Sequence, residues 1–570
     1  MRQRWIWTLA VAALFSSCSV SEDLEMEVPS ADDCILEVAV GLGDGGKTRG
    51  LSGNTSSITA TWQAGDKVLV YKDNTKVGEL TPVSTGSVST TLRGKLSGSY
   101  ASYTAGSTLT LYLNSTETSY TDFTQDGTLA TILANLRYQS ATTTISKASD
   151  RPALTGTAVT FNLAANNPSI NHFTLNQAMK TLRVSAQGST TLLASATADS
   201  PTTDFYVAIP AAASQTYLIE GISEYPYCEY FQAKTAALSA NKYYSASVNL
   251  TENPLTFEPV SATTTVTIKV SERWATLPDL IQYSDDDGVT WKENDDVGNL
   301  WSGLTWTVKA GQRLMVRFLW NNPLDSYNSM FYGNCFIVDQ PCYVYGNIGS
   351  LLGADADAAT DYNYCFYGSF SGQINIRSHP FRRLVIGLWG TSQVRNMYNI
   401  FRSMFYGCSG LTTAPVLDFS NWDTSSVEDI GDMFNGMFSG CSSLTTAPVL
   451  DLSMFDTGQV IDINRMFNSM FSGCTSLTTG PVLDLSNFDT SSVAFINGMF
   501  SSMFSGCRNL NAVKMKLTNT TILGNTSGFE NFLTGAKDTG TLTVSSGTTS
   551  YWNDIKTAGY IPSGWSFTEE

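Results

Sequence analysis

The sequence has few histidines. The two that it has, His172 and His379, lie far apart in the chain. Metal sites built on histidine, and pairs of a nucleophile with a histidine, need such side chains to converge on one point. Acidic residues are plentiful, but a glycosidase needs two carboxylates that converge, and the sequence does not show such convergence. We therefore expect no metal site, no cofactor, no catalytic residues and no enzymatic activity.

Basic residues are also scarce, with 33 Lys plus Arg against 50 Asp plus Glu and a net charge of −17. This charge repels the phosphates of nucleic acids and of anionic membrane surfaces. Only 15% of the residues are charged, whereas 11% are aromatic, a profile typical of β-rich extracellular proteins. The 570 residues predict about three or four domains.

The chain has no long apolar run after its N-terminus, so we expect no membrane-spanning helix. At the N-terminus, Met1–Arg4 is basic, Trp5–Phe15 is apolar, and small residues lead to Cys18. Residues 1–18 are therefore predicted to be a secretory signal peptide. Its end resembles a lipobox, which implies that Cys18 carries the lipid. Residues 19–33 form an acidic tether, which resembles the signal that sends lipoproteins to the outer face of the outer membrane. We thus expect a cell-surface protein anchored by lipid alone.

A phrase with two phenylalanines recurs along the second half of the chain, for example at Met433–Gly440, Met466–Gly473 and Met499–Gly506. A period near 33 residues predicts stacked units that bury their apolar sides against each other. Val427, Ile430, Met433 and the apolar residues that follow are spaced as on one face of a helix, with Gly440 at its end. The alternating pattern of Pro448–Ser453 predicts a strand. We expect equivalent strands at Pro415–Ser420, Pro481–Ser486, Ala512–Leu517 and Arg383–Leu388.

The motif of residues 437–444 followed by 450–457 resembles the BspA-like leucine-rich repeats of bacterial surface proteins. This resemblance implies an α/β leucine-rich-repeat solenoid over residues 351–545, with about six units and a C-terminal cap at 546–570. It also implies a surface that binds host or bacterial partners. The units here are longer than the common family unit, because the Met-Phe phrase is doubled and Ala-Pro-Val precedes the strand.

Four cysteines recur every 33 residues, at Cys408, Cys441, Cys474 and Cys507. One thiol per repeat spreads along a line, whereas a zinc site needs its ligands at one point. We therefore expect buried thiols that pack as small apolar groups. Two other pairs, Cys34 with Cys228 and Cys335 with Cys342, are candidates for disulfide bridges.

Residues 34–253 contain short alternating runs separated by turn residues, which predicts a β-sandwich. An early strand at Ile35–Leu42, Thr48-Arg49, Trp62–Lys67 and Asn176–Met179 resemble features of fimbrillins, the subunits of bacterial fimbriae. The resemblance implies that cleavage after Arg49 removes the first strand, and that a strand of another subunit fills the groove. A surface arginine in a glycine-rich turn is the alternative for Arg49.

Residues 254–350 are predicted to form a second β-sandwich, with Asp287-Gly288 as a hairpin turn. This region is rich in tryptophan, and aromatic rings suit the apolar C–H faces of sugars, although core packing is the alternative. The candidate glycan-binding residues are Trp274, Trp291, Trp301, Trp306 and Trp320.

Two functions follow from these observations. The first is a cell-surface adhesin, or a tip or accessory subunit of a fimbria (a pilus), that binds host or bacterial partners through its solenoid. The alternative is a surface glycan-binding lipoprotein of a polysaccharide-uptake system.

Overall fold

The computed structural model describes residues 34–42, 62 and 65–570, except 86, 88, 99, 118–120, 148–152, 157–158, 163, 190, 225–228, 272–276, 321–323, 325, 354–355 and 388. The predictions for the signal peptide, Cys18, the acidic tether, Arg49, Trp274 and Cys228 lie outside the described residues. The described chain is mostly β-sheet with few helices and forms two compact units. None of its helices combines the length and the apolar character needed to cross a bilayer.

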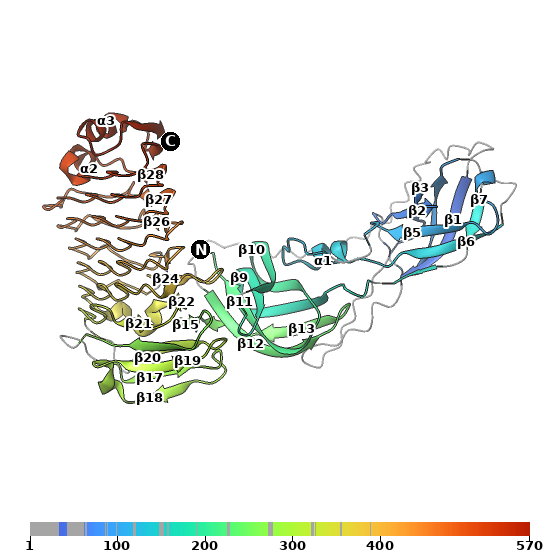
Figure 1. Cartoon of the computed structure of the whole chain (residues 1–570), viewed down its shortest axis with the longest axis horizontal. Helices are drawn as coiled ribbons and strands as arrows, with labels where there is room; N and C mark the ends of the chain where they lie inside the picture. Colours follow the sequence, from blue (N-terminus) through green and yellow to red (C-terminus); the bar gives the residue numbers. More distant parts are fainter. Residues whose placement is uncertain are drawn as a thin grey trace, which may run out of the picture. The chain divides into compact units, whose positions relative to one another are not determined.

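The first unit contains one sheet in the strand order β4-β3-β2-β5-β6-β7-β1-β8 (Figure 1). A further antiparallel pairing of β1 with β4 closes the sheet on itself. The core contains alternate residues of β1, of which Leu36 and Val38 are fully buried. The strands are β1 (Cys34–Leu42), β2 (Val68–Lys72), β3 (Thr75–Pro82), β4 (Ser89–Leu96), β5 (Thr108–Leu113), β6 (Ala141–Lys147), β7 (Ala153–Gly156) and β8 (Val159–Phe161).

The second unit begins with a separate sheet in the order β10-β9-β11-β12-β14, with β13 paired to β9. Its apolar side chains form a core of their own around Phe173, Leu182 and Val207. The structure therefore divides residues 34–253, which the sequence treats as one sandwich region, between two units. The elements are α1 (Leu129–Asn135), β9 (Ser169–Ala186), β10 (Leu192–Ile209), β11 (Ala212–Ile222), β12 (Glu229–Leu238), β13 (Tyr243–Val248) and β14 (Thr251–Glu252).

Two sheets follow within the second unit and share one core. The larger has the order β18-β17-β20-β15-β22-β24-β25, and the smaller has the order β19-β16-β21. Because β22 also pairs in parallel with β23 and β24, the larger sheet continues directly into the repeats. The elements are β15 (Leu255–Pro259), β16 (Thr264–Ile268), β17 (Leu280–Ser284), β18 (Lys292–Asn294), η2 (Val297–Leu300), β19 (Leu304–Val308), β20 (Leu314–Leu319), β21 (Phe336–Val338), β22 (Cys342–Asn347), η3 (Ile348–Leu351) and η4 (Ala356–Ala358).

The repeats stack in parallel, one above another, as Figure 1 shows. Their predicted strands are found, although most are short. We call each copy a rung and the whole the repeat stack. Parallel pairs join β24 to β25, and β26 through β30 in succession. The strands are β23 (Ile376–Arg377), β24 (Leu384–Ile386), β25 (Val416–Leu417), β26 (Leu450–Asp451), β27 (Thr479–Asp484), β28 (Ala512–Lys516), β29 (Thr539–Val544) and β30 (Gly564–Glu569).

The predicted helix of each repeat is wrong, because the described residues of 359–519 form turns and short strands and no helix. Positive φ angles recur at every fourth residue, as at Asp432 (54°), Gly436 (62°) and Gly440 (76°), and an α-helix cannot contain them. Backbone N–H groups instead alternate between two acceptors. Asn435 donates within its own turn to Asp432, whereas Gly436 donates to Asn468 of the next rung. The prediction of an apolar face is correct, since Val427, Ile430 and Met433 are fully buried.

Two columns of phenylalanine rings run through the stack. Phe434 and Phe467 stack with their centroids 5.6 Å apart, and Phe438 and Phe471 do so at 5.5 Å. Together with the methionines beside them, these rings make one continuous core that extends from Leu255 to Trp565. The two sheets formed by β15–β22, which we call the middle sheets, and the repeat stack are thus held together by shared apolar packing.

The stack has one more rung at its start than the sequence predicts. Met330-Phe-Tyr-Gly333 lies inside the predicted second sandwich, yet Phe331 stacks on Phe366 with centroids 5.1 Å apart, and Ser326 pairs with Asp361. At the other end, α2 (Thr520–Gly524), η5 (Thr526–Phe529) and α3 (Thr549–Thr557) follow the last regular rung. The buried ring of Trp552 in α3 packs against Phe529, with centroids 5.3 Å apart.

Candidate binding surfaces

The strands of the repeat stack present a regular outer surface, which we call the strand face. Alternation along each strand buries Leu450 and Leu483 and turns Val449 and Val482 outward, where they are 66% and 39% exposed. Exposed threonines of the preceding turns, such as Thr446, continue the same surface. Clustered exposed apolar side chains with a polar surround are typical of contact surfaces.

The turns form a second, more polar surface in which acidic residues stand above one another. The backbones of Asp429 and Asp462 form a parallel β-bridge between neighbouring rungs. Each carboxylate accepts a backbone N–H from two residues further along the chain, from Gly431 at 2.9 Å and from Asn464 at 2.7 Å. Burial, together with the neighbouring Asp462 and Asp432 carboxylates, raises the pKa of Asp429 to about 6 despite the Gly431 hydrogen bond. Among the described residues, no group of three or more His, Cys, Asp or Glu side chains is arranged to hold a metal ion.

Tyrosines gather at the first rungs of the same surface. The rings of Tyr332 and Tyr367 stack with centroids 4.7 Å apart and planes 12° apart, and Tyr364 meets Tyr332 edge-on at 5.9 Å. Arg402 lies over the ring of Tyr367 at 5.8 Å and pairs with the buried Asp432 at 3.0 Å. Sequence reasoning did not select Tyr332, although the repeated Met-Phe-Tyr-Gly phrase around it was a usable signal.

The four described tryptophans of the glycan prediction do not form one platform. Trp306 packs on Tyr283 with centroids 5.8 Å apart, and the Trp320 indole donates to the Leu351 carbonyl at 3.2 Å. Trp291 lies under the guanidinium of Arg317, 4.1 Å from the ring centroid. Trp301 is the most exposed of the four, at 45%.

All four cysteines of the repeat column are buried and free, as in a packing role. Each thiol donates to a backbone carbonyl of the rung before it, for example Cys441 to Phe405 at 3.1 Å. Burial raises the pKa of Cys408 and Cys507 to about 12. The candidate bridge between Cys335 and Cys342 is not formed, because both thiols are free, and Cys34 is also free.

A buried set of charged residues lies where the β9–β14 sheet, the middle sheets and the first repeats meet. Arg382 is the centre: its guanidinium contacts both carboxylate oxygens of Glu220, at 2.5 and 3.1 Å, and one oxygen of Glu258 at 3.4 Å. Tyr345 donates to Glu258 at 2.5 Å, and Arg313 pairs with Asp287 at 2.5 Å.

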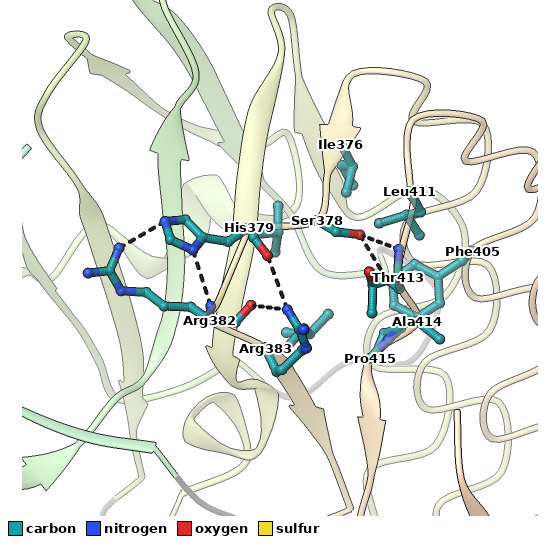
Figure 2. A pocket seen from close by; sticks show the side chains of 12 residues that line it. Ile376, Ser378, His379, Arg382, Arg383, Phe405, Leu411, Thr413, Ala414 and Pro415 are labelled. Atoms are coloured by element: carbon teal, nitrogen blue, oxygen red, sulfur yellow. Dashed lines mark hydrogen bonds between the residues drawn. The ribbon is translucent and has the colours of Figure 1, made fainter. Parts of the chain in front are cut away.

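His379 contacts Arg382 of this cluster, and Figure 2 shows the hydrogen bonds between the two residues. Its Nδ1 accepts the backbone N–H of Arg382 at 3.1 Å, and its Nε2 lies 2.9 Å from the Arg382 guanidinium. Burial and the surrounding arginines lower the pKa of His379 to about 2, so the ring stays neutral. The adjoining cavity, lined by Ser378, Leu411 and Pro415 among others, measures only about 20 Å³. That space holds about one water molecule. The contacts of Arg382 show that this cluster joins distant parts of the fold.

Comparisons with known proteins give two findings. Residues 366–533, less than a third of the chain, match a family described as Mycoplasma protein of unknown function, DUF285. Among solved structures, the alignment with a Streptococcal ancillary pilin covers 50% of this chain and 87% of the pilin chain, at 7% sequence identity. The TM-score of 0.16 is too low to indicate a shared fold. No curated protein matches the chain significantly.

Proposed function

We propose that this chain is a cell-surface lipoprotein that acts as an adhesin, or as a tip or accessory subunit of a fimbria. In this proposal the repeat stack binds a host or bacterial surface partner, and the lipid on Cys18 holds the protein at the outer membrane. The proposal includes no catalytic activity. The resemblance to BspA-like leucine-rich repeats supports the binding role, although the units here turn where that family pattern implies a helix.

The observation that carries the proposal is that the side chains of each rung divide into a buried set and an exposed set. The repeated phenylalanine, methionine and cysteine side chains are buried in the core. What remains outside is a regular array in which corresponding side chains of neighbouring rungs lie about 4.8 Å apart. Such an extended surface can contact a macromolecular partner at many points, as repeat proteins commonly do.

Purified protein and immobilised host matrix proteins provide the test. The double variant Val449→Glu/Val482→Glu places two charges on the strand face, at positions that are already exposed, so the core is untouched. We expect binding to fall at least about tenfold, because a carboxylate in an apolar contact must lose its water. Ile461→Glu, at a 43% exposed position of another column, is the matched control. Full binding by the double variant would exclude the strand face.

Point variants are preferable to removal of the repeats. The core of the middle sheets continues into the stack without a break, so deleting residues 360–570 would expose apolar residues such as Phe331 and Phe336. Loss of binding after that deletion would not distinguish a lost surface from a damaged fold.

Assembly into a fimbria is supported by the position of β1. This strand precedes Arg49, pairs with β4 on one side and with β7 and β8 on the other, and buries Leu36 and Val38. Cleavage at Arg49 would free β1 and leave a groove that a strand of another subunit can fill with the same backbone hydrogen bonds. N-terminal sequencing of surface-extracted protein is the check: a start at Gly50 supports cleavage, and an intact N-terminus blocked at Cys18 argues against it.

A further inference from the structure

A hollow of about 460 Å³ opens at the N-terminal end of the repeat stack, lined by Lys269, Ser271, Trp301, Tyr332 and neighbouring backbone. Its volume lies within the range of small-ligand sites. Trp301 follows η2, Lys269 and Ser271 follow β16, and Tyr332 belongs to the first rung. Three separate segments of the chain therefore meet around one space.

Backbone hydrogen bonds fix these segments to each other. Lys269 N–H donates to the Cys335 carbonyl at 3.0 Å, Val270 N–H to the Leu300 carbonyl at 3.1 Å, and Ser271 N–H to the Met330 carbonyl at 2.9 Å. The segment of Lys269–Ser271 is thus tied both to the rung that holds Tyr332 and to the helical turn before Trp301. A ligand entering the hollow would meet walls that are already in place, which lowers the entropic cost of binding.

The two aromatic residues of the hollow are unusually open. Trp301 and Tyr332 are 45% and 43% exposed, although rings of this size usually find packing partners. One face of the Tyr332 ring is covered by Tyr367, which stacks on it nearly parallel. Tyr332 also lines the hollow, so the part of its ring that Tyr367 does not cover is available to a ligand there. Tyr332 therefore offers a flat apolar surface whose orientation is set from behind.

The polar groups at the hollow point to a particular ligand chemistry. In the following rungs the corresponding carbonyls accept a backbone N–H, as Tyr367 does from Gly333. In the part of the chain that the structure describes, the Tyr332 carbonyl is contacted only by the Cys335 thiol, at 3.6 Å, and so has capacity for a hydroxyl donor. None of the ion pairs found among the described residues includes Lys269, which is notable in a chain of net charge −17.

From this combination we propose that the hollow binds a saccharide that carries a carboxylate, such as a uronic or sialic acid residue. The C–H face of the sugar ring stacks on Tyr332, with Trp301 as the second apolar wall. A sugar hydroxyl donates to the Tyr332 carbonyl, and the carboxylate pairs with the Lys269 ammonium. This site is separate from the strand face. Of the tryptophans predicted to bind glycans it contains Trp301, together with Tyr332 and Lys269, which were not part of that prediction.

Calorimetry with the full mature chain tests the proposal. The acidic probes are a hyaluronan hexasaccharide, a galacturonic acid hexamer and sialyllactose, and the neutral probes are cellohexaose and lactose. We expect at least one acidic probe to bind, with affinity that falls as salt is added. Tyr332→Ala and Trp301→Ala should each weaken binding about tenfold or more, whereas Tyr332→Phe, which keeps the ring, should bind nearly as wild type.

Two further variants separate the contributions. Lys269→Gln should weaken binding of the acidic probe and remove its salt dependence. Trp291→Ala, in the same domain but stacked on Arg317 away from the hollow, should leave binding unchanged. Near-ultraviolet circular dichroism confirms that each variant is folded.

Several results would overturn the inference. These are no binding of any acidic probe at low millimolar concentration, equal affinity for the neutral probes, unchanged binding by folded Tyr332→Ala and Trp301→Ala, and loss of binding in Trp291→Ala.

Discussion

Replacing Arg382 should destabilise the second compact unit more than any exposed substitution. Its side chain is 1% exposed and contacts Glu220 twice and Glu258 once. Arg382→Met keeps much of the side-chain volume but leaves two buried carboxylates without their closest cation. Removing one partner of a buried ion pair typically costs about 3–5 kcal/mol, and Arg313, which already pairs with Asp287, offsets little of it.

Urea unfolding followed by tryptophan fluorescence measures this change. All described tryptophans except Trp62 belong to the second unit, so the signal reports mainly on that unit. Arg395→Met is the control, because the pair of Arg395 with Glu428 is 69% and 53% exposed and should contribute less than about 1 kcal/mol. A loss below about 1 kcal/mol for Arg382→Met would refute the role given to this cluster.

Three other properties of the repeat stack can be measured. Gly473→Ala should destabilise the stack by about 1–2 kcal/mol in urea unfolding, because φ at Gly473 is +76°. The added Cβ itself would meet only ordinary contacts at 3.7 Å, so the expected loss comes from the backbone conformation. Gly524→Ala is the control, because Gly524 has a negative φ and open space around it. Asp429→Asn should stabilise the protein by about 1 kcal/mol at pH 8 and not at pH 4. The reason is that the pKa of Asp429 is raised to about 6, so the ionised form is unfavourable above that pH. Equal effects of the substitution at the two pH values would contradict this prediction. The Cys441 thiol should resist alkylation in the folded protein at pH 8, because burial raises its pKa well above the ordinary value, and rapid labelling without urea would show that the column is open.

The apolar pattern of the repeats predicted which side chains are buried but not the backbone that carries them. Val427, Ile430 and Met433 have a spacing that suits a helix face, and the same spacing fits successive turns that each return to the core. The distinguishing signal was present, since residues tolerant of positive φ recur at every fourth position, as Asp432, Gly436 and Gly440 do. The turns are stable because backbone N–H groups of one rung donate to carbonyls of the neighbouring rung. An isolated helix would satisfy these groups internally, so the sequence of one repeat does not reveal this pairing.

The parts of the site that depend on distant residues could not be predicted. Glu220 and Arg382 meet across 162 positions of sequence, and neither lies in a pattern that marks it as buried. The hollow beside Tyr332 likewise requires three segments whose adjacency follows from the first rung docking on β16 and η2. By contrast, the thiol column was predictable, because one residue per repeat must form one line in any regular stack.

The most direct measurement of the central proposal is adhesion of whole bacterial cells that carry the altered protein. Cells with wild-type protein and cells with Ile461→Glu should adhere to host matrix equally, and cells with Val449→Glu/Val482→Glu should not, while antibody staining of intact cells shows equal surface display of all three. Adhesion of the double variant at the wild-type level would contradict a binding role for the strand face of the repeat stack.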